Sequence, residues 1–277
     1  MAANEGRHPI SARRRLLGVA RSTYYSMRSR PGRPAAPAVV AAHATSKGRY
    51  GPRKIKASLE RSGVIVSRRR VCRIMRENGL AGAYARKRFK VHPGAVNEAD
   101  APNLAARGFG GRAPRTHICS DLACVRVGAS WNCVCLLVDP CNREIIGQSA
   151  GPGKDARPVR PAFATPSFPI SDIGVFHTDR GSEPDEAEID PMLEAFGIER
   201  SLSAKGRPCD NAVDESTDRT PKAELARRGT FGTTRELRAK LSDYMHRYDN
   251  FRTHSTLGYM SPDEFREAGL SLPESSK

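Results

Sequence analysis

The chain has 277 residues, with 46 Lys and Arg against 30 Asp and Glu, a net charge of +16 and a sequence pI of about 10.0. No stretch approaches the ~20 apolar residues of a membrane span, and the first residues alternate charged with apolar side chains, unlike a signal segment. Seven cysteines at irregular spacing favour reduced thiols over a disulfide framework, so we expect a cytoplasmic protein with no membrane partner.

The basic charge lies in the first third of the chain. Residues 1–100 hold 23 Lys or Arg and 5 Asp or Glu, whereas the remaining residues hold 23 and 25. A basic block of this kind is the electrostatic footprint of phosphate binding, which releases counterions and weakens as salt rises. The distribution therefore predicts that this third binds nucleic acid. For residues 1–46, a merely solvated or disordered basic arm is the alternative.

The first predicted elements are helices. Residues 13–28 outline a helix-turn-helix, because a Gly-containing turn is followed by a Ser-led helix start. The prolines of residues 30–38 predict a linker. Residues 49–80 predict a second, stronger pair of helices, with Ile55 and Leu59 at helical spacing in the first of them.

The second helix of this pair has clear boundaries and a basic outer side. Ser67 is its N-cap candidate and Gly79 ends it. Its apolar residues are Val71, Ile74 and Met75. The arginines fall on the side predicted to face solvent, where a recognition helix contacts DNA. The predicted DNA-binding residues are Arg53, Lys54, Arg68, Arg69, Arg70, Arg73 and Arg76.

A pattern of strands follows a stretch without sustained periodicity, residues 81–115, which predicts a basic linker. Three strands in consecutive hairpins are predicted first, and strands that alternate with helices come after them. The predicted strands are 116–127, 131–140, 143–151, 173–179 and 200–203, and the predicted helices are 189–198, one that starts near residue 211, and 236–252.

Three carboxylates carry the chemical prediction: Asp121 within the first strand, Asp179 after the fourth and Glu215 at a helix start. Three acidic groups that converge would repel unless cations lie between them, and hard oxygen ligands suit Mg²⁺ or Mn²⁺. That ligand set is typical of two-metal phosphoryl transfer. The alternative for each carboxylate alone is a surface charge or a helix cap. Cys133 and Cys135 form a weak candidate zinc pair without a second pair of ligands.

Three runs carry a family resemblance: HTDRGSE, SLSAKGRPCDNAVDES and YDNFRTHSTLGYMSPDEF. Together with the 35 residues between Asp179 and Glu215, they resemble the bacterial insertion-sequence transposases of the OrfB type, relatives of retroviral integrase with a DD(35)E triad. The resemblance spans about residues 49 to 267. It implies an α/β, RNase H-like catalytic core preceded by a small all-α helix-turn-helix region. The implied domains are a basic helical arm (1–46), a helix-turn-helix domain (47–97), a linker (98–115), the catalytic core (116–268) and a tail (269–277).

The resemblance also implies a reaction and its partners. Asp121, Asp179 and Glu215 would hold two Mg²⁺ or Mn²⁺ ions, and water and then a 3′-hydroxyl of DNA would attack the phosphodiester. It implies double-stranded DNA as partner, a homo-multimer on paired element ends, an upstream OrfA product and association with the bacterial nucleoid. Contacts with phosphate are suggested for His177, Arg180 and Lys205, with packing or surface roles as the alternative. A contact with DNA or with the metal site is suggested for Arg252 and His254.

Several positions depart from the residues usual in this family. Cysteine replaces tyrosine at 124, 133 and 209, proline replaces leucine at 158 and 221, and Asp249 replaces asparagine. A proline six residues past Glu215 would cost its helix roughly 3 kcal/mol unless the helix ends or kinks there. Two hypotheses therefore stay open. The chain is an active DDE-type transposase, or it is a decaying copy that only binds DNA at element ends.

Overall fold

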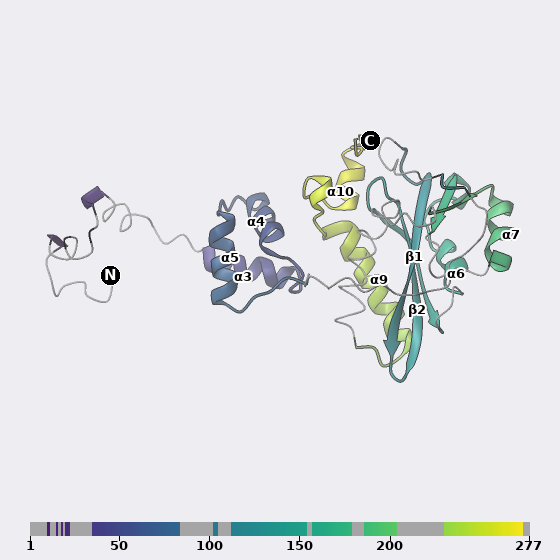
Figure 1. Ribbon diagram of the computed structural model, residues 1–277, viewed down its shortest axis with the longest axis horizontal. Helices are drawn as coiled ribbons and strands as arrows, with labels where there is room; N and C mark the ends of the chain where they lie inside the picture. Colours follow the sequence, from purple (N-terminus) through teal and green to yellow (C-terminus); the bar gives the residue numbers. More distant parts are fainter. Residues whose placement is uncertain are drawn as a thin grey trace. The chain divides into compact units, whose positions relative to one another are not determined.

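The computed structural model describes residues 35–83, 102–104, 112–153, 157–178, 186–203 and 230–273, with isolated positions between residues 10 and 22. The side chains of Asp121 and of residues 186–188 lie outside this description. The chain divides into two compact units, Met1–Ala81 and Gly82–Lys277 (Figure 1). No described helix is both long and apolar enough to cross a membrane.

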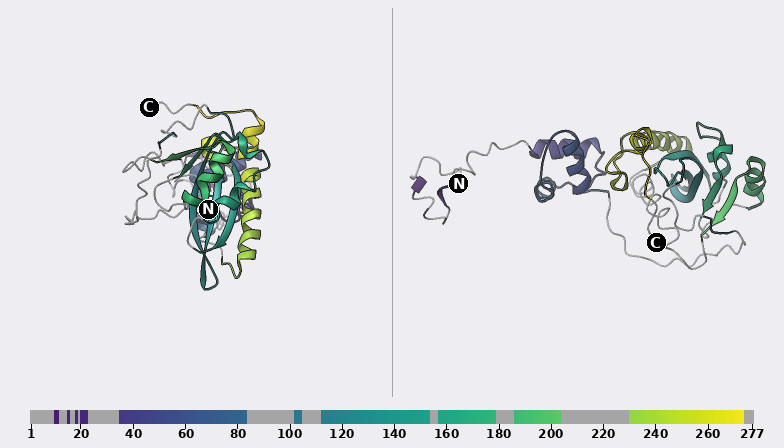
Figure 2. Two further views of the ribbon diagram at one scale, coloured as in Figure 1. Left: turned by 90° about the vertical axis from the view of Figure 1, so that its right-hand side faces the viewer. Right: turned by 90° about the horizontal axis from the view of Figure 1, so that it is seen from above.

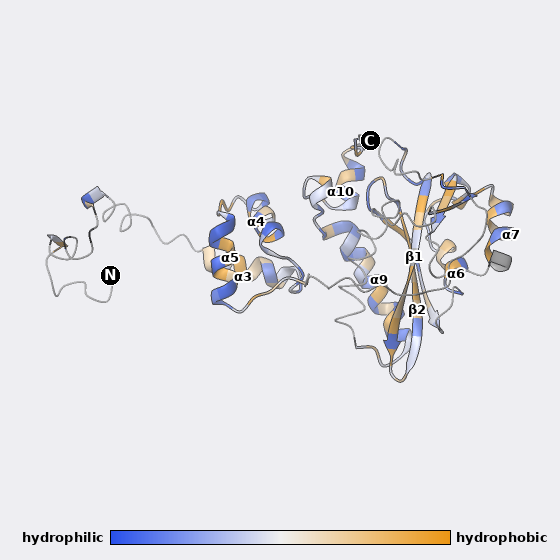
Figure 3. Ribbon diagram, viewed as in Figure 1, coloured by the Kyte–Doolittle hydropathy of each residue, from blue (hydrophilic) through white to orange (hydrophobic). Residues whose placement is uncertain are grey.

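From residue 35 onward, the first unit consists of three helices, α3 (Ala35–Thr45), α4 (Pro52–Arg61) and α5 (Arg68–Glu77). Their apolar sides meet in one core, which confirms the helix pair predicted within residues 49–80. In Figure 3 blue and orange alternate along α5, as expected of an amphipathic helix. The buried core residues are Ala35, Val39, Tyr50, Ile55, Leu59, Val66, Val71, Ile74 and Met75.

The helix boundaries follow from capping residues. The Oγ of Ser67 accepts a hydrogen bond from the backbone N–H of Arg70 at 3.3 Å, which confirms the predicted N-cap of α5. Gly79, with φ +63°, follows the C-cap residue and ends the helix as predicted. The predicted linker was wrong for residues 35–38, which begin α3. Pro37 falls in the first turn of that helix, where a missing N–H costs no intrahelical bond.

A five-stranded sheet in the order β3-β2-β1-β4-β5 is the centre of the second unit. The first three strands pair antiparallel, whereas β1 pairs β4 and β4 pairs β5 in parallel. This order, with helices on both faces, is that of an RNase H-like fold and confirms the predicted fold class. The strands are β1 (His117–Val127), β2 (Ser130–Val138), β3 (Ile145–Pro152), β4 (Val175–Thr178) and β5 (Glu199–Leu202).

Helices cover the sheet on both sides. The long helix α9 (Thr234–Phe251) lies along one face, which is seen from the edge in the left view of Figure 2. Its buried Leu237, Leu241, Tyr244 and Tyr248 pack on β1, β2 and β3. Helices α6 (Val159–Phe163) and α7 (Glu186–Phe196) contribute to a second core on the other face. A helix was predicted for residues 189–198, and α7 starts three residues earlier, so Pro191 lies inside it.

Both edges of the sheet are covered. On β3, Thr165 Oγ1 accepts a hydrogen bond from the N–H of Gln148 at 2.9 Å, and Arg238 Nε donates to the carbonyl oxygen of Ala150 at 2.8 Å. Pro152, the last residue of β3, has no N–H to offer. On β5, the N–H of Leu202 donates to the carbonyl oxygen of Pro102 at 3.2 Å.

The C-terminal helix α10 (Pro262–Glu267) was not predicted from the sequence. Its signal is a capping box, in which Ser261 Oγ accepts from the N–H of Glu264 and the carboxylate of Glu264 accepts from the N–H of Ser261. Short 3₁₀ turns occur at Ile170–Asp172 and Ser255–Leu257. The helix expected from near residue 211 lies in a part of the chain that the structure does not describe.

Candidate functional site

The outer side of α5 is the most basic surface element of the first unit. We call its five exposed arginines the arginine face. They alternate with the buried Val71, Ile74 and Met75, so the predicted solvent-facing position of all five is confirmed. The arginine face consists of Arg68, Arg69, Arg70, Arg73 and Arg76.

The charges of the arginine face oppose the electrostatics of their own helix. The first turn of α5 contains no acidic residue, and Arg68, Arg69 and Arg70 occupy it next to the positive end of the helix dipole. The first turn of α4 likewise has no acidic residue and contains Arg53 and Lys54. An anion beside these helix starts would relieve the repulsion, and DNA phosphates are anions of this kind.

Adjacent strands of the second unit lead toward the predicted carboxylate site. Ser120 of β1 lies directly opposite Thr178 of β4 in parallel register. Asp121 follows Ser120 within β1, where its backbone pairs with Leu136 of β2. Asp179 is next after Thr178 in the sequence, but it and Glu215 are outside the described residues. The triad therefore stays a prediction.

His177 lies at the end of β4, and its ring is part of the fold. It is 3% exposed, with Nδ1 2.8 Å from Ser201 Oγ and Nε2 3.3 Å from Ser203 Oγ. Both ring nitrogens therefore have protein partners, whichever tautomer is present. These contacts favour the packing role over the phosphate contact suggested for this residue. Arg180 and Lys205 are not among the described residues.

Arg252 and His254 belong to the corner that follows α9. Arg252 is 6% exposed, and its guanidinium carbon lies 5.5 Å from the ring centroid of Tyr248. The ring of His254 packs edge-on against the same tyrosine at 4.9 Å between centroids, and the backbone N–H of His254 donates to the carbonyl oxygen of Met260 at 2.9 Å. Contact with DNA, as predicted for both, would require Arg252 to leave this packing.

A half-buried acidic group lies near the β2–β3 connection, where the sequence showed the charge but not its surroundings. Asp249 of α9 accepts a hydrogen bond from the N–H of Ile145 at 2.9 Å. Burial, followed by the nearby Glu144 and Asp263, raises the pKa of Asp249 to about 8, although Arg266 opposes this shift. Arg266 is shared, because it pairs with Glu144 and lies 2.8 Å from Asp263. Glu144 has a second partner, because its Oε1 lies 3.5 Å from Nη2 of Arg115.

A second carboxyl group is buried in the β2–β3 connection itself. Asp139 is 1% exposed and accepts hydrogen bonds from the N–H groups of Arg115, at 2.6 Å, and Cys141, at 2.8 Å. Burial raises its pKa to about 6, although both hydrogen bonds act in the opposite direction. These bonds explain the role of Asp139, which holds the connection closed. Among the described residues, no three side chains that could bind a metal ion lie close together.

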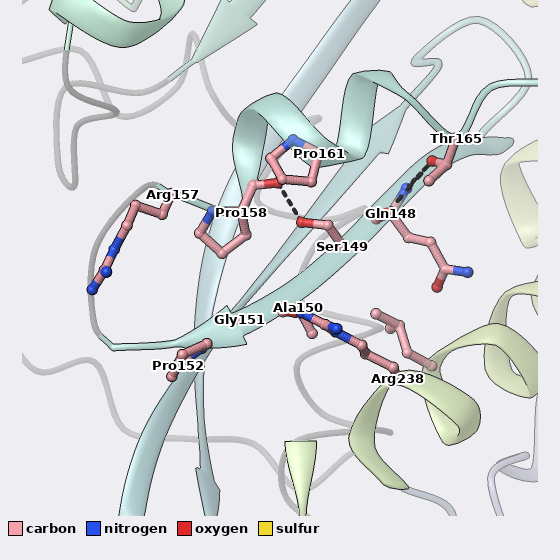
Figure 4. A pocket seen from close by; sticks show the side chains of 11 residues that line it. Gln148, Ser149, Ala150, Gly151, Pro152, Arg157, Pro158, Pro161, Thr165 and Arg238 are labelled. Atoms are coloured by element: carbon pink, nitrogen blue, oxygen red, sulfur yellow. Dashed lines mark hydrogen bonds between the residues drawn. The ribbon is translucent and has the colours of Figure 1, made fainter. Parts of the chain in front are cut away.

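A pocket of about 510 Å³ lies between β3, α6 and α9 (Figure 4). Arg157 and Arg238 are its only charged lining residues among those described, and it contains no carboxylate or histidine. The hydroxyl of Ser149 donates to the carbonyl oxygen of Pro158 in its wall.

Comparisons with known proteins agree with this geometry. A family model described as an HTH-like domain matches residues 34–88, which contain α3, α4 and α5, and an integrase core domain model matches residues 196–262. Among curated proteins, the transposase for insertion sequence element IS904 of Lactococcus lactis is 29% identical over 80% of this chain and 88% of its own length. The chain is a relative of the insertion-sequence transposases.

Two further relatives extend the match to nearly the whole chain. Transposase InsF for insertion sequence IS3A of Escherichia coli is 28% identical over 95% of both chains. The putative transposase InsK for element IS150 of the same species is 27% identical over 94% of both chains. The predicted kinship is thus confirmed, and so are the integrase-type core and the enzyme class that goes with it, a polynucleotidyl transferase.

Solved structures with some likeness are the catalytic core domain of BIV integrase and a simian T-cell lymphotropic virus intasome. The first has 17% identity and a TM-score of 0.41, and it covers 56% of this chain and 96% of that one. The second has 13% identity and a TM-score of 0.42, and it covers 86% of this chain and 78% of that one.

Proposed function

We propose that this chain is a DNA transposase that cleaves and joins the ends of a bacterial insertion sequence by phosphodiester transesterification. The observation that carries the proposal is the parallel register of Ser120 and Thr178 in a relative of the transposases. Each of these residues directly precedes an aspartate, Asp121 or Asp179. Because neighbouring strands lie about 4.8 Å apart, continuation of the register by one residue would place the two aspartates side by side.

The residues at this position fit a divalent metal site. Two aspartates on neighbouring strands and Glu215 from the following segment would supply the oxygen ligands that Mg²⁺ or Mn²⁺ prefers. When bound, two such ions would activate the attacking oxygen and stabilise the leaving 3′-oxygen. The task of the protein is to hold the three carboxylates and to keep the two reacting DNA strands in line. Glu215 would complete the set from outside the sheet.

The first unit would bring the catalytic unit to its DNA. The arginine face and the basic starts of α4 and α5 suit the phosphate backbone of double-stranded DNA. Joining needs two element ends and a target, so we expect the protein to act as a homo-multimer, together with an upstream OrfA product, on the bacterial nucleoid.

A second candidate function is that of a decaying copy that binds element ends without efficient catalysis. Asp249 favours this reading. It is a half-buried carboxyl group close to Glu144 and Asp263, where the family usually has a neutral asparagine. Desolvation and these two carboxylates raise the pKa of Asp249 to about 8, so stability is lost as pH rises toward that value. Pro158, in contrast, gives it no support, because it is the residue before α6, where no intrahelical N–H is needed.

Strand transfer in vitro, with Mg²⁺ and DNA that carries the element's terminal repeats, tests the first function. Asp121→Asn, Asp179→Asn and Glu215→Gln should each abolish joining, because each removes a metal ligand, while binding of the ends persists. Asp172→Asn, at an exposed aspartate before β4, is the matched control and should join normally. Joining that survives any of the three triad changes would refute the two-metal triad.

The same assay separates the two candidate functions. The decaying-copy hypothesis predicts that the natural sequence binds ends but joins them weakly, and that Asp249→Asn combined with Pro221→Leu restores joining. Efficient joining by the natural sequence would rule this hypothesis out.

A further inference from the structure

Ile65 is the most exposed large hydrophobic residue among those that the structure describes. Its side chain is 76% exposed, whereas the other described members of this class range from 37% to 66%. It lies in the extended connection between α4 and α5, two residues before the N-cap Ser67. The neighbours on either side turn inward, because Val66 is buried and Val64 packs against the core of the unit. The alternation of an extended chain therefore presents Ile65 outward.

We infer that Ile65 is a specificity-determining residue that packs against the 5-methyl group of a thymine in the major groove when α5 docks on DNA. The inference rests on the proposed function, and it adds an apolar contact to a surface otherwise composed of arginines. Ile65 and the first turn of α5 would then read the DNA together.

The position of Ile65 beside the start of α5 supports this assignment. Recognition helices contact base edges mainly through their N-terminal residues. Two residues of extended chain separate Ile65 from Ser67 by about 7 Å at most, so the side chain lies next to the first turn. The hydroxyl of Ser67 is already used in the cap, where it accepts from Arg70 N–H. Among the outward-facing residues at this end, Ile65 and the arginines are left to meet the bases.

Charge favours DNA over a protein as the occupant of this surface. Arg68, Arg69 and Arg70 follow Ile65 closely, and Arg61 ends the preceding helix. The local excess of positive charge around this apolar side chain favours a polyanionic partner such as DNA. The major groove instead offers negative potential together with one apolar group, the thymine methyl. Arginines that read guanine and an isoleucine that reads thymine would select a site containing both bases.

The test measures binding of the full-length chain to duplexes in which thymine is replaced by deoxyuridine, which lacks only the 5-methyl group. The duplexes are those recovered as the tightest binders from a randomised pool. The natural protein should bind the thymine duplex about fourfold more tightly than the deoxyuridine duplex, the effect expected for burial of one methyl group. Ile65→Ala should bind the thymine duplex more weakly and should no longer distinguish the two duplexes.

Val40→Ala is the matched control, because Val40 is the other exposed large hydrophobic residue described in this unit, at 37%. It should behave as the natural protein does, and all variants should keep the natural melting temperature. An Ile65→Ala variant that binds both duplexes as the natural protein does would overturn the inference. Equal loss on thymine and deoxyuridine duplexes would also overturn it, since Ile65 would then contact the DNA backbone or a protein partner.

The inference can fail while the proposed function stands. If Arg69→Ala with Arg73→Ala weakens DNA binding and Ile65→Ala does not, α5 binds DNA without help from Ile65. If neither change weakens binding, the assignment of the first unit to DNA fails as well.

Discussion

Asp249 is the residue at which burial and charge conflict most directly. Its pKa is raised from 3.8 to about 8, so the folded protein holds a proton there that the unfolded chain has lost above about pH 4. The folded state therefore binds more protons than the unfolded state in this window, and stability falls as pH rises through it. Asp139, with its pKa raised to about 6, contributes the same trend only up to about pH 6.

Asp249→Asn should therefore stabilise the protein at neutral pH. Asparagine can keep the hydrogen bond from Ile145 N–H through its amide oxygen, and it introduces no charge. Each pH unit between the two pKa values is worth about 1.4 kcal/mol, so the melting temperature at pH 7 should rise by several degrees. Thermal unfolding measured from pH 6 to 8 should also show a flatter pH dependence in the variant.

Asp243→Asn is the control for this change, because Asp243 lies on the same helix and is exposed. It should leave both the melting temperature and its pH dependence nearly unaltered. A natural protein whose stability does not decline between pH 6 and 8 would show that Asp249 is already ionised in the fold.

Single residues were predictable from the sequence where their partners are local. The cap at Ser67 and the helix end at Gly79 depend on neighbours within one turn, and both are confirmed. The surroundings of Asp249 depend on Ile145, which is 104 residues away, so the sequence could show an extra charge there but not its burial. The hydrogen bonds of His177 to Ser201 and Ser203 escaped prediction for the same reason.

At the scale of elements, helix α7 contains a proline in its interior, where proline disfavours a helix. Pro191 is the sixth of its eleven residues, where proline removes a hydrogen bond and its ring crowds the carbonyl of residue 187. Pro191→Ala should therefore raise the free energy of unfolding by roughly 1–3 kcal/mol, measured by denaturant titration. Pro161→Ala is the matched control in α6, where the proline lies in the first turn and its replacement should have little effect. A neutral Pro191→Ala would mean that the helix starts at Ile189, as the sequence predicted.

The arginine face makes a second prediction at this scale. Arg69→Ala combined with Arg73→Ala should lower the preference for element ends over other DNA, because each lost base contact is worth ~1–3 kcal/mol of discrimination. The ion pair of Arg73 with Glu77, 3.7 Å long and exposed on both sides, adds little to stability, so the fold should persist. Competition binding with end and non-end duplexes measures the preference, and Lys47→Ala, at an exposed lysine after α3, is the control. A uniform loss on all sequences would identify these arginines as phosphate contacts.

Elements were predicted well where the hydrophobic periodicity extends over many residues. They were predicted less well where prolines interrupt the pattern or where the element is short. The alternation in 116–151 predicted three hairpin-connected strands, and the structure has them as β1, β2 and β3. Helix α3 was missed over its first residues because the prolines there resemble a linker. Helix α10, six residues long, is too short for a periodic signal, and only its capping box marks it.

At the scale of the whole molecule, the uneven distribution of charge predicts which part of the chain binds DNA with an affinity that depends on salt. A fragment that ends near Val96 carries the basic block and should bind duplex DNA with a steep salt dependence, because phosphate contacts release counterions. Residues 116–277 alone should bind poorly. Fluorescence anisotropy across a series of salt concentrations compares the two fragments. Equal affinity at moderate salt would contradict the assignment of DNA binding to the first third of the chain.

The architecture of the molecule was predictable and its catalytic geometry only in part. The antiparallel pairing of the first three strands follows from pattern and from short connections, and it is confirmed. The approach of Asp179 and Glu215 to Asp121 depends on long-range folding of segments whose local sequence carries many polar and Gly or Pro residues. Periodicity says little about such segments, so the spacing of the carboxylates supports the triad without locating it.

The covered edges of the sheet bear on how copies of this protein meet one another. An open edge strand invites a strand from a second molecule, and from there growth into aggregates. On β3, hydrogen bonds to Thr165 and Arg238 occupy backbone groups that a second strand would need, and Pro152 has no N–H to offer. Residues 102–104 run beside β5. Copies of the protein can therefore be concentrated without pairing of these edge strands into fibres. Arg238→Ala, by uncovering the carbonyl of Ala150, should make concentrated protein precipitate sooner, which light scattering would record.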